Sequence, residues 1–279
     1  FTAENVDDRV GYAVAGAGDT NGDGYADLLI GGHGLGDSAT TVDRGRAYLV
    51  FGNVSGTHSL SNADVRLTGE DPYDRAGYRV SGGGDTDGDG LDDILIFAHG
   101  DDDGADHAGA VYLVYGGISA DITLSAADAK FYGEGADDIA GVGLSGAGDL
   151  NGDGLDDILI GASQNNEGGA DSGIVYVVLG GVTGTHSLST AYAELIGEDS
   201  YSYVGQSISG TGDVDGDGIG DILIGSWADD TGAANAGAAY LVLGGVSGSH
   251  NLSDAHTKLT GGAAGDNAGA AVAGAGDVD

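Results

Sequence analysis

The stretch that decides the fold is Asp85–Phe97, DTDGDGLDDILIF, in which an acidic, glycine-rich loop runs directly into an apolar segment. Carboxylates fall at positions 1, 3, 5 and 9 of the loop Asp85–Asp93, and Gly falls at positions 4 and 6. The apolar segment that follows has no polar alternation, which is typical of a short strand buried on both faces. The stretch therefore predicts a turn that gathers acidic side chains at the entrance of a β-strand.

This unit recurs along the whole chain of 279 residues. The other acidic loops are Asp19–Asp27, Asp149–Asp157 and Asp213–Asp221, and Asp277-Val278-Asp279 begins a fifth. Corresponding segments begin at Phe1, Leu67, Phe131, Leu195 and Leu259, with spacings of 66, 64, 64 and 64 residues. Self-similarity at a fixed period indicates a repeat architecture. We expect one repeat domain over residues 1–279, with repeats 1–66, 67–130, 131–194 and 195–258 and a partial repeat 259–279.

Each repeat has four short apolar segments joined by Gly, Asp and Ser. In the second repeat they are Gly77–Gly83, Asp93–Phe97, Gly109–Tyr115 and Ala129–Gly133. None of them has a sustained 3.6-residue period, so helix is expected to be minor. Four short strands per repeat predict an all-β fold, a β-propeller with four-stranded blades and about four and a third repeats in this chain. The competing β-helix has much shorter rungs than 64 residues.

Composition excludes several classes of protein. The 58 Gly come with a single Pro, which excludes collagen, and the 13 Tyr and 41% hydrophobic residues argue against a disordered acidic chain. The formal net charge of −37 argues against nucleic acid and anionic membranes as partners and favours divalent cations. The absence of Cys excludes a thiolate metal site. Because Met is absent even at position 1, we expect a mature fragment, an excised domain or an incomplete chain.

The acidic loops have the chemistry of a calcium site. Calcium prefers about 6–8 hard oxygen ligands, and a curled loop brings side chains at positions 1, 3 and 5 to one point. Gly at position 6 permits the turn, position 7 offers a backbone carbonyl, and Asp at position 9 closes the site. An EF-hand is excluded because its Glu at position 12 is replaced by Ile30, Ile96, Ile160 or Ile224.

We therefore predict about four calcium ions, one per complete repeat. The predicted ligands are Asp19, Asn21, Asp23, Tyr25 and Asp27; Asp85, Asp87, Asp89, Leu91 and Asp93; Asp149, Asn151, Asp153, Leu155 and Asp157; and Asp213, Asp215, Asp217, Ile219 and Asp221. Simple acidic turns are the alternative, since Asp and Gly both favour turns. Four copies at a fixed phase favour calcium.

The run GxGD-x-[ND]-GDG-xxD-[LI]-L-I-G, followed later by GxxYLVxG, resembles the FG-GAP repeat of integrin α chains and of secreted bacterial proteins. The resemblance covers essentially the whole chain. It implies a seven-bladed ring, calcium on one rim with the same ligand set, and extracellular adhesion or recognition. The family's Phe-Gly step is replaced here, for example by Val10-Gly11 and Ala76-Gly77, and its Gly-Ala-Pro step lacks the Pro.

Other recurring residues have simpler explanations. Tyr48, Tyr112, Tyr176 and Tyr240 are expected in the core. His58, His186 and His250 are expected to serve packing or turns, because Ile122 takes the same position in the second repeat. The acidic run Asp101–Asp106 is expected to be a solvated face, with an extra cation site as the alternative, and Trp227 to be a packed aromatic, with sugar stacking as the alternative.

Function follows as a set of hypotheses. No G-x-S-x-G or H-E-x-x-H motif occurs, so no catalytic residue and no enzymatic activity are expected. The first hypothesis is a calcium-binding extracellular or cell-surface module, of bacterial origin, for adhesion, surface display or recognition of a protein or glycan. The alternatives are a calcium-stabilised filament or ring joined head to tail, and a non-catalytic accessory domain of a larger secreted enzyme. No nucleic acid and no membrane insertion are expected.

Overall fold

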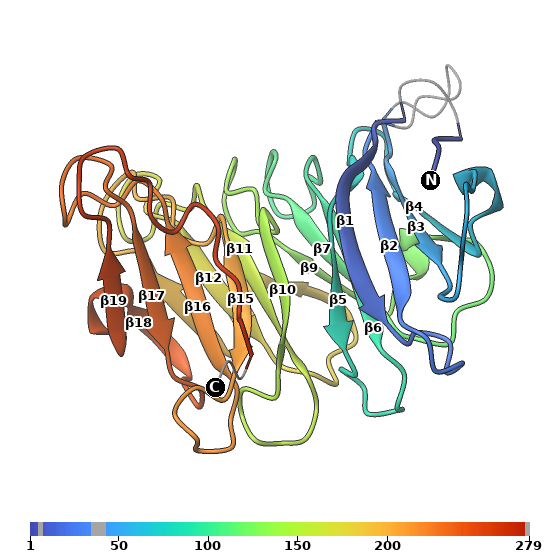
Figure 1. The fold of residues 1–279 in the computed structure, drawn as a ribbon. Helices are drawn as coiled ribbons and strands as arrows, with labels where there is room; N and C mark the ends of the chain where they lie inside the picture. The colour runs from blue at the N-terminus through green and yellow to red at the C-terminus, as the bar shows by residue number, and fades with distance from the viewer. Residues whose placement is uncertain (5–7, 35–42, 277–279) are drawn as a thin grey trace.

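The computed structural model describes residues 1–4, 8–34 and 43–276, and over these residues the chain is all-β. Four sheets stand side by side in chain order, as Figure 1 shows. None of the described residues forms a helix long and apolar enough to cross a membrane. The all-β prediction and its division into four-stranded blades are confirmed.

Each blade is an antiparallel meander of four strands, the last of which crosses the boundary into the next repeat. The strands Gly77–Gly83, Asp93–Phe97, Gly109–Tyr115 and Ala129–Gly133 predicted for the second repeat each coincide with an observed strand to within two residues at either end. The blades comprise β1 (Val10–Gly18), β2 (Asp27–Gly32), β3 (Arg46–Val50) and β4 (Val65–Thr68); β5 (Ala76–Gly84), β6 (Asp93–Ala98), β7 (Ala110–Val114) and β9 (Ala129–Tyr132); β10 (Gly143–Gly148), β11 (Asp157–Ala162), β12 (Ile174–Val178) and β14 (Ala193–Ile196); and β15 (Ile208–Gly212), β16 (Asp221–Ser226), β17 (Ala238–Val242) and β19 (Thr257–Thr260).

A fifth strand joins three of the sheets and was not predicted. The strands β8 (Ile122–Thr123), β13 (Gly184–Ser187) and β18 (Gly248–Asn251) each leave their own repeat and pair in parallel with the outer strand of the preceding blade. A single 3₁₀ turn follows each of them, and a fourth occurs in the first repeat: η1 (Leu60–Asn62), η2 (Leu124–Ala126), η3 (Leu188–Thr190) and η4 (Leu252–Asp254). These strands tie neighbouring blades together through the backbone.

The core lies between blades rather than within them. One buried cluster combines Leu29 and Leu49 of the first blade with Ile94 and Ile96 of the second. A sheet of this kind is apolar on both faces and needs a neighbour on each side. The recurring tyrosines are buried in all four blades, as predicted: Tyr48, Tyr112, Tyr176 and Tyr240.

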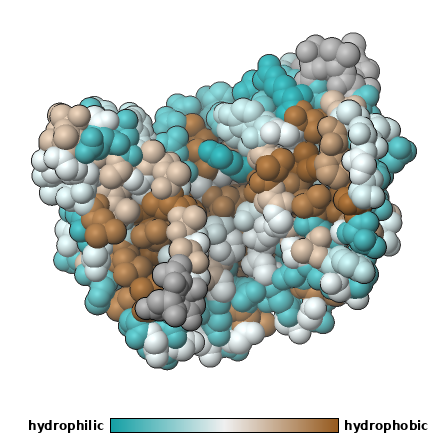
Figure 2. Space-filling view, viewed as in Figure 1, coloured by the Kyte–Doolittle hydropathy of each residue, from teal (hydrophilic) through white to brown (hydrophobic). Residues whose placement is uncertain are grey.

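The two end blades expose the faces that interior blades bury. Val14 in β1 is 70% exposed, whereas its counterparts Val80 and Ile208 are 8% exposed. Leu259 in β19 is 61% exposed, whereas Leu67 is fully buried. Figure 2 shows the result as two separate brown areas, one over β1 and β2 and one over β16 to β19. The described residues form four blades in a row, and they do not close the seven-bladed ring that the resemblance implies.

The partial fifth repeat does not form its expected first strand. Residues 261–276 contain no strand, although the backbone N–H of Val272 donates to Ser207 Oγ at 2.9 Å, beside β15. A propeller inner strand is held by the second strand of its own blade, and no second strand of this repeat lies within residues 261–276. Asp277 and Asp279 lie outside the described residues.

Candidate metal centre

All four acidic loops lie at one rim of the molecule, because each connects the inner strand of a blade to its second strand (Figure 1). In the second loop, Gly88 and Gly90 have φ values of 80° and 89°. This left-handed region is readily open only to Gly. The predicted sharp turn at loop positions 4 and 6 is thus present, and it curls the loop around the side chain at position 1.

The second loop brings three carboxylates together. Asp85, Asp87 and Asp89 each offer one oxygen, and these oxygens lie within 4.8 Å of one another. Asp85 accepts hydrogen bonds from the backbone N–H of Gly88 at 2.8 Å and of Gly90 at 3.0 Å. Three carboxylates at this separation repel one another and are the hard oxygen donors that calcium prefers. Positions 1, 3 and 5 of this loop therefore fit a divalent cation.

The other three loops are built in the same way. The carboxylates of Asp19, Asp149 and Asp213 accept from the Gly at positions 4 and 6 of their own loops at 2.6–2.9 Å. In the first and third loops, the amide nitrogens of Asn21 and Asn151 donate to the carboxylate at position 5. The side chain of Asp215 in the fourth loop accepts from the backbone N–H of Asp217 at 3.1 Å.

Backbone donors also set the ionisation of position 1. The N–H of Gly218, aided by that of Gly216, lowers the pKa of Asp213. For Asp149, desolvation acts in the opposite direction, and the N–H groups of Gly154 and Gly152 outweigh it, so that the pKa is lowered. Hydrogen bonds to a carboxylate favour its charged form. These two residues are held as anions, the form that a metal ligand requires.

Position 7 closes each turn. The backbone N–H of Tyr25, Leu91, Leu155 and Ile219 donates to the carboxylate at position 5, on Asp23, Asp89, Asp153 and Asp217, at 2.8–2.9 Å. This bond orients the position-5 side chain. The role of the position-7 carbonyls as calcium ligands stays a prediction.

Position 9 has a second role that the loop spacing did not reveal. Asp93 is fully buried, and one oxygen accepts from the backbone N–H of Thr86 at 2.8 Å while the other accepts from Gly116 at 2.8 Å. Asp93 is not one of the three residues whose oxygens gather in its loop. The corresponding Asp27, Asp157 and Asp221 are buried and bonded in the same pattern. Position 9 therefore clamps the loop to the turn after the third strand.

Burial of this clamp affects its protonation. Desolvation raises the pKa of Asp93 to about 6 and that of Asp157 to about 6, although backbone donors oppose the shift. A cation in the adjacent loop would favour the charged form of both groups.

Position 8 links neighbouring loops and was missed. Asp92 of the second loop accepts from the backbone N–H of Asp19 at 2.7 Å, and Asp156 of the third accepts from Asp85 at 3.0 Å. A Cβ at Gly18 would lie 2.1 Å from Asp92 Oδ2, so only Gly leaves room for this contact. The available signal was that position 8 is Asp in the second and third loops alone.

A second set of charges lies between blades, around the buried tyrosines. Tyr112 donates to Glu70 Oε1 at 2.7 Å, and Lys130 pairs with Glu70, with Asp101 at 2.7 Å and with Asp103 at 2.6 Å. The acidic run Asp101–Asp106 is therefore not simply a solvated face, because Asp101 is buried in an ion pair. Blade 4 repeats the arrangement with Tyr240, Lys258, Glu198 and Asp229.

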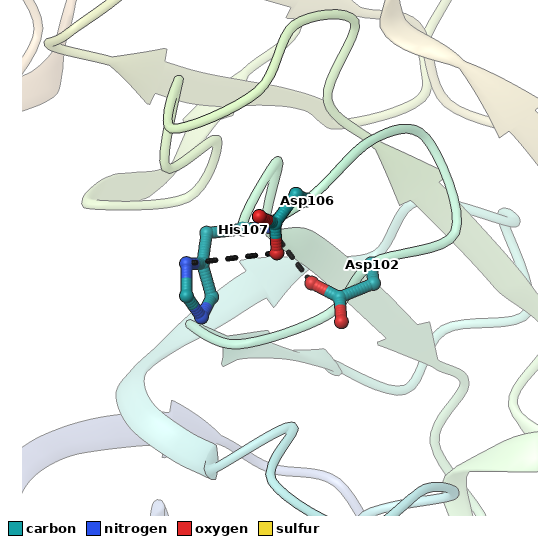
Figure 3. A group of neighbouring side chains, drawn as sticks. All are labelled: Asp102, Asp106 and His107. Atoms are coloured by element: carbon teal, nitrogen blue, oxygen red, sulfur yellow. Dashed lines mark hydrogen bonds and ion pairs between the residues drawn. The ribbon is translucent and has the colours of Figure 1, made fainter.

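The exposed end of the same run forms a separate group, shown in Figure 3. Asp102, Asp106 and His107 each offer one atom within 4.8 Å of the others, and all three are exposed. The backbone N–H of His107 donates to Asp102 at 2.8 Å, which accounts for the shape of the loop. The recurring histidines, in contrast, serve turns as predicted: His58, His186 and His250 contact the carbonyl three residues earlier through Nε2 at 2.7–2.8 Å.

Comparison with known proteins identifies the repeat. The FG-GAP repeat model matches residues 76–114 and 140–178, which contain the second and third acidic loops. Integrin alpha-4 of Xenopus laevis is 34% identical over 157 residues, 54% of this chain and 14% of its own length. Phosphatidylinositol-glycan-specific phospholipase D of Bos taurus is 29% identical over 218 residues, 72% of this chain and 25% of its own length.

The matched parts of these relatives are short, since the chain spans a quarter or less of the length of each. The acidic groups in the structure agree with metal sites in the repeats. Sequence match, repeat spacing and four-stranded blades lead to one conclusion. The chain contains FG-GAP repeats and has integrin α chains and phosphatidylinositol-glycan-specific phospholipase D among its distant homologues.

Proposed function

We propose that the chain is a calcium-binding, non-enzymatic module of the cell exterior that recognises a protein or a glycan. The observation that carries the proposal is the convergence of Asp85, Asp87 and Asp89 within one loop, in a frame that the other three loops repeat. Bound calcium would neutralise the carboxylates at this rim and hold adjacent loops in register. In this proposal calcium stabilises the structure, and the rim opposite the acidic loops recognises the partner.

Isothermal titration with calcium into EDTA-treated protein tests the metal. We expect about four ions per chain and a rise in melting temperature, because a ligand at about 100 times its Kd stabilises the folded state by about 2.7 kcal/mol per site. Magnesium at the same concentration should stabilise less, since it prefers a tighter octahedral shell. An unchanged melting temperature with and without calcium would contradict the proposal.

Self-association is a second candidate function, favoured by the exposed end faces. Val14 and Leu259 are largely exposed, although their counterparts in interior blades pack against a neighbouring blade. We propose that the first blade of one copy packs against the last blade of another. Light scattering should show concentration-dependent mass that Val14→Asp and Leu259→Asp each abolish, with Tyr201→Asp, an exposed site away from both faces, as the control. A monomer at every concentration would refute self-association.

A further inference from the structure

The rim opposite the acidic loops carries a group of cationic and aromatic side chains at the seam of the first two blades. Tyr12 lies near the start of β1 and His33 follows the end of β2, so both are at the far end of their strands from the loop Asp19–Asp27. Tyr78 and His99 occupy the same places on β5 and β6. We call this group, together with Arg9 and Arg75, the seam cluster.

The seam cluster is held together by direct contacts. The hydroxyl of Tyr12 donates to that of Tyr78 at 3.0 Å across the blade boundary. The ring of His33 lies 4.4 Å from that of Tyr12 and 5.0 Å from that of Tyr78, and His99 lies 4.7 Å from Tyr78 on the other side. Arg9 Nη1 lies 3.4 Å from His33 Nε2. Four rings and a guanidinium thus form one continuous chain of contacts.

Comparison of the four repeats shows that the residues of this cluster are not part of the shared scaffold. The acidic loops and the buried tyrosines recur in every repeat, but the Arg-Tyr-His set occurs only in the first two. The third repeat has Ile139, Val142 and Ser163 at these places, and the fourth has Tyr203, Gln206 and Trp227. Folding of a blade therefore does not require Arg, Tyr and His here, and another selective pressure is needed to explain them.

The distribution of cationic residues also sets the seam cluster apart. The chain has 8 cationic residues against 45 acidic ones, and two of the eight, Arg9 and Arg75, belong to the seam cluster. Their influence reaches the rings: burial first, then the charges of Arg9 and Arg75, lower the pKa of His33, and burial followed by Arg75 lowers the pKa of His99. Asp43 acts on His33 in the opposite direction. Two of the eight cationic residues of a strongly acidic protein thus act on the histidine rings of this cluster.

Free hydrogen-bonding capacity remains within the cluster. His33 is 4% exposed, and its Nδ1 has no hydrogen-bond partner among the described residues; the same holds for Nδ1 of His99. Tyr12, in contrast, is 54% exposed, and Arg9 is exposed. An exposed ring beside guanidinium groups offers a stacking face, hydroxyls and bidentate donors for an anion.

We propose that the seam cluster binds a single anionic sugar residue at the end of an otherwise neutral glycan. The sugar ring stacks on Tyr12, and its carboxylate or sulfate is held by Arg9, whose guanidinium lies beside His33, and by Arg75. A polyanion is disfavoured because the net charge of −37 repels it beyond the seam, over a screening length of about 8–10 Å. An acidic peptide side chain would lack the rigid ring that uses the exposed aromatic face.

This inference rests on the proposed recognition role but not on the calcium sites, and its test separates the two. Methyl glucuronide, methyl glucoside and glucose 6-sulfate are titrated into the calcium-loaded chain by isothermal calorimetry. We expect at least one of the anionic sugars to bind about tenfold or more tightly than the glucoside, as a charge-assisted pair predicts, and their ranking separates carboxylate from sulfate. If the three sugars bind equally, or if none binds to a chain that still binds calcium, the sugar site is refuted and the calcium sites are not.

Variants locate the site. Arg9→Gln should weaken the anionic sugar about tenfold and leave the glucoside unchanged, and Tyr12→Ala should weaken both. Tyr201→Ala is the matched control, because Tyr201 is 57% exposed and lies in the connection between β14 and β15. If the sugar quenches the fluorescence of Trp227, the single Trp, and Tyr12→Ala leaves that quenching unchanged, the sugar binds in blade 4 and the seam cluster is refuted as its site. Tighter binding of an Asp-containing tripeptide than of either anionic sugar would replace the glycan with a peptide ligand.

Discussion

The Asp side chains of one acidic loop differ in burial and in hydrogen-bond partners. Asp89 is exposed and shares its loop with two other carboxylates, whereas Asp93 is buried and accepts from the backbone of Thr86 and Gly116. Removing an exposed anion relieves repulsion when calcium is absent. Removing a buried acceptor leaves its donors without a partner, at a cost of about 1–3 kcal/mol for each donor.

These roles predict opposite results in EDTA. Asp93→Ala should lower the free energy of unfolding by roughly 3 kcal/mol with or without calcium. Asp89→Ala should leave it unchanged or slightly higher in EDTA, and should lower it only in calcium. Urea denaturation of both variants in the two buffers measures this. Equal losses in EDTA would show that position 5 is also structural.

Across a whole blade, the ion network around the buried tyrosine varies in one informative place. The cross-strand partner of each tyrosine is Arg66, Lys130 or Lys258 in blades 1, 2 and 4, but it is Glu194 in blade 3. Burial, followed by the charges of Glu194 and Glu134, raises the pKa of Glu167. Blade 3 therefore holds mutually repelling carboxylates where its neighbours hold an ammonium or guanidinium group.

We predict that Glu194→Lys stabilises the protein by about 1 kcal/mol, because it restores an ion pair and removes a repulsion. The reciprocal change, Lys130→Glu, should cost about 3–5 kcal/mol, since it leaves Glu70 and the buried Asp101 unpaired. Thermal melts at low and high salt measure both, and salt should reduce the gain at Glu194. A destabilised Glu194→Lys protein would mean that blade 3 needs the carboxylate.

The elements also show how far the sequence could be read. The run DILIF and the acidic loop before it predicted β6 and its entry turn, because apolar continuity and Asp-Gly spacing are local signals. The parallel strand β13 was missed, since Gly184–Ser187 is short and polar and gains its pairing only from β9 of the preceding blade. Asp92 escaped notice for the same reason: its partner, Asp19, is 73 residues away. Contacts between repeats leave little trace within one repeat.

Over the whole molecule, burial of acidic groups makes stability depend on pH. Desolvation raises the pKa of Asp74 to about 7 from its ordinary value of 3.8. Below that ordinary value, both the folded and unfolded carboxyl are protonated. As pH rises, the unfolded chain ionises first while the folded chain keeps its proton, so stability falls between about pH 4 and pH 7 and then levels off. Asp93 and Asp157, with pKa values of about 6, act in the same direction.

In EDTA, the free energy of unfolding should therefore decline by a few kcal/mol from pH 4 to pH 7. Asp74→Asn should flatten this decline, because the amide can still accept from the backbone N–H of Asp71 but no longer ionises. Asp102→Asn removes the same charge from an exposed side chain and is the control for net charge, so it should leave the slope intact. Equal flattening by both variants would assign the pH dependence to overall repulsion among 45 acidic residues rather than to burial at one site.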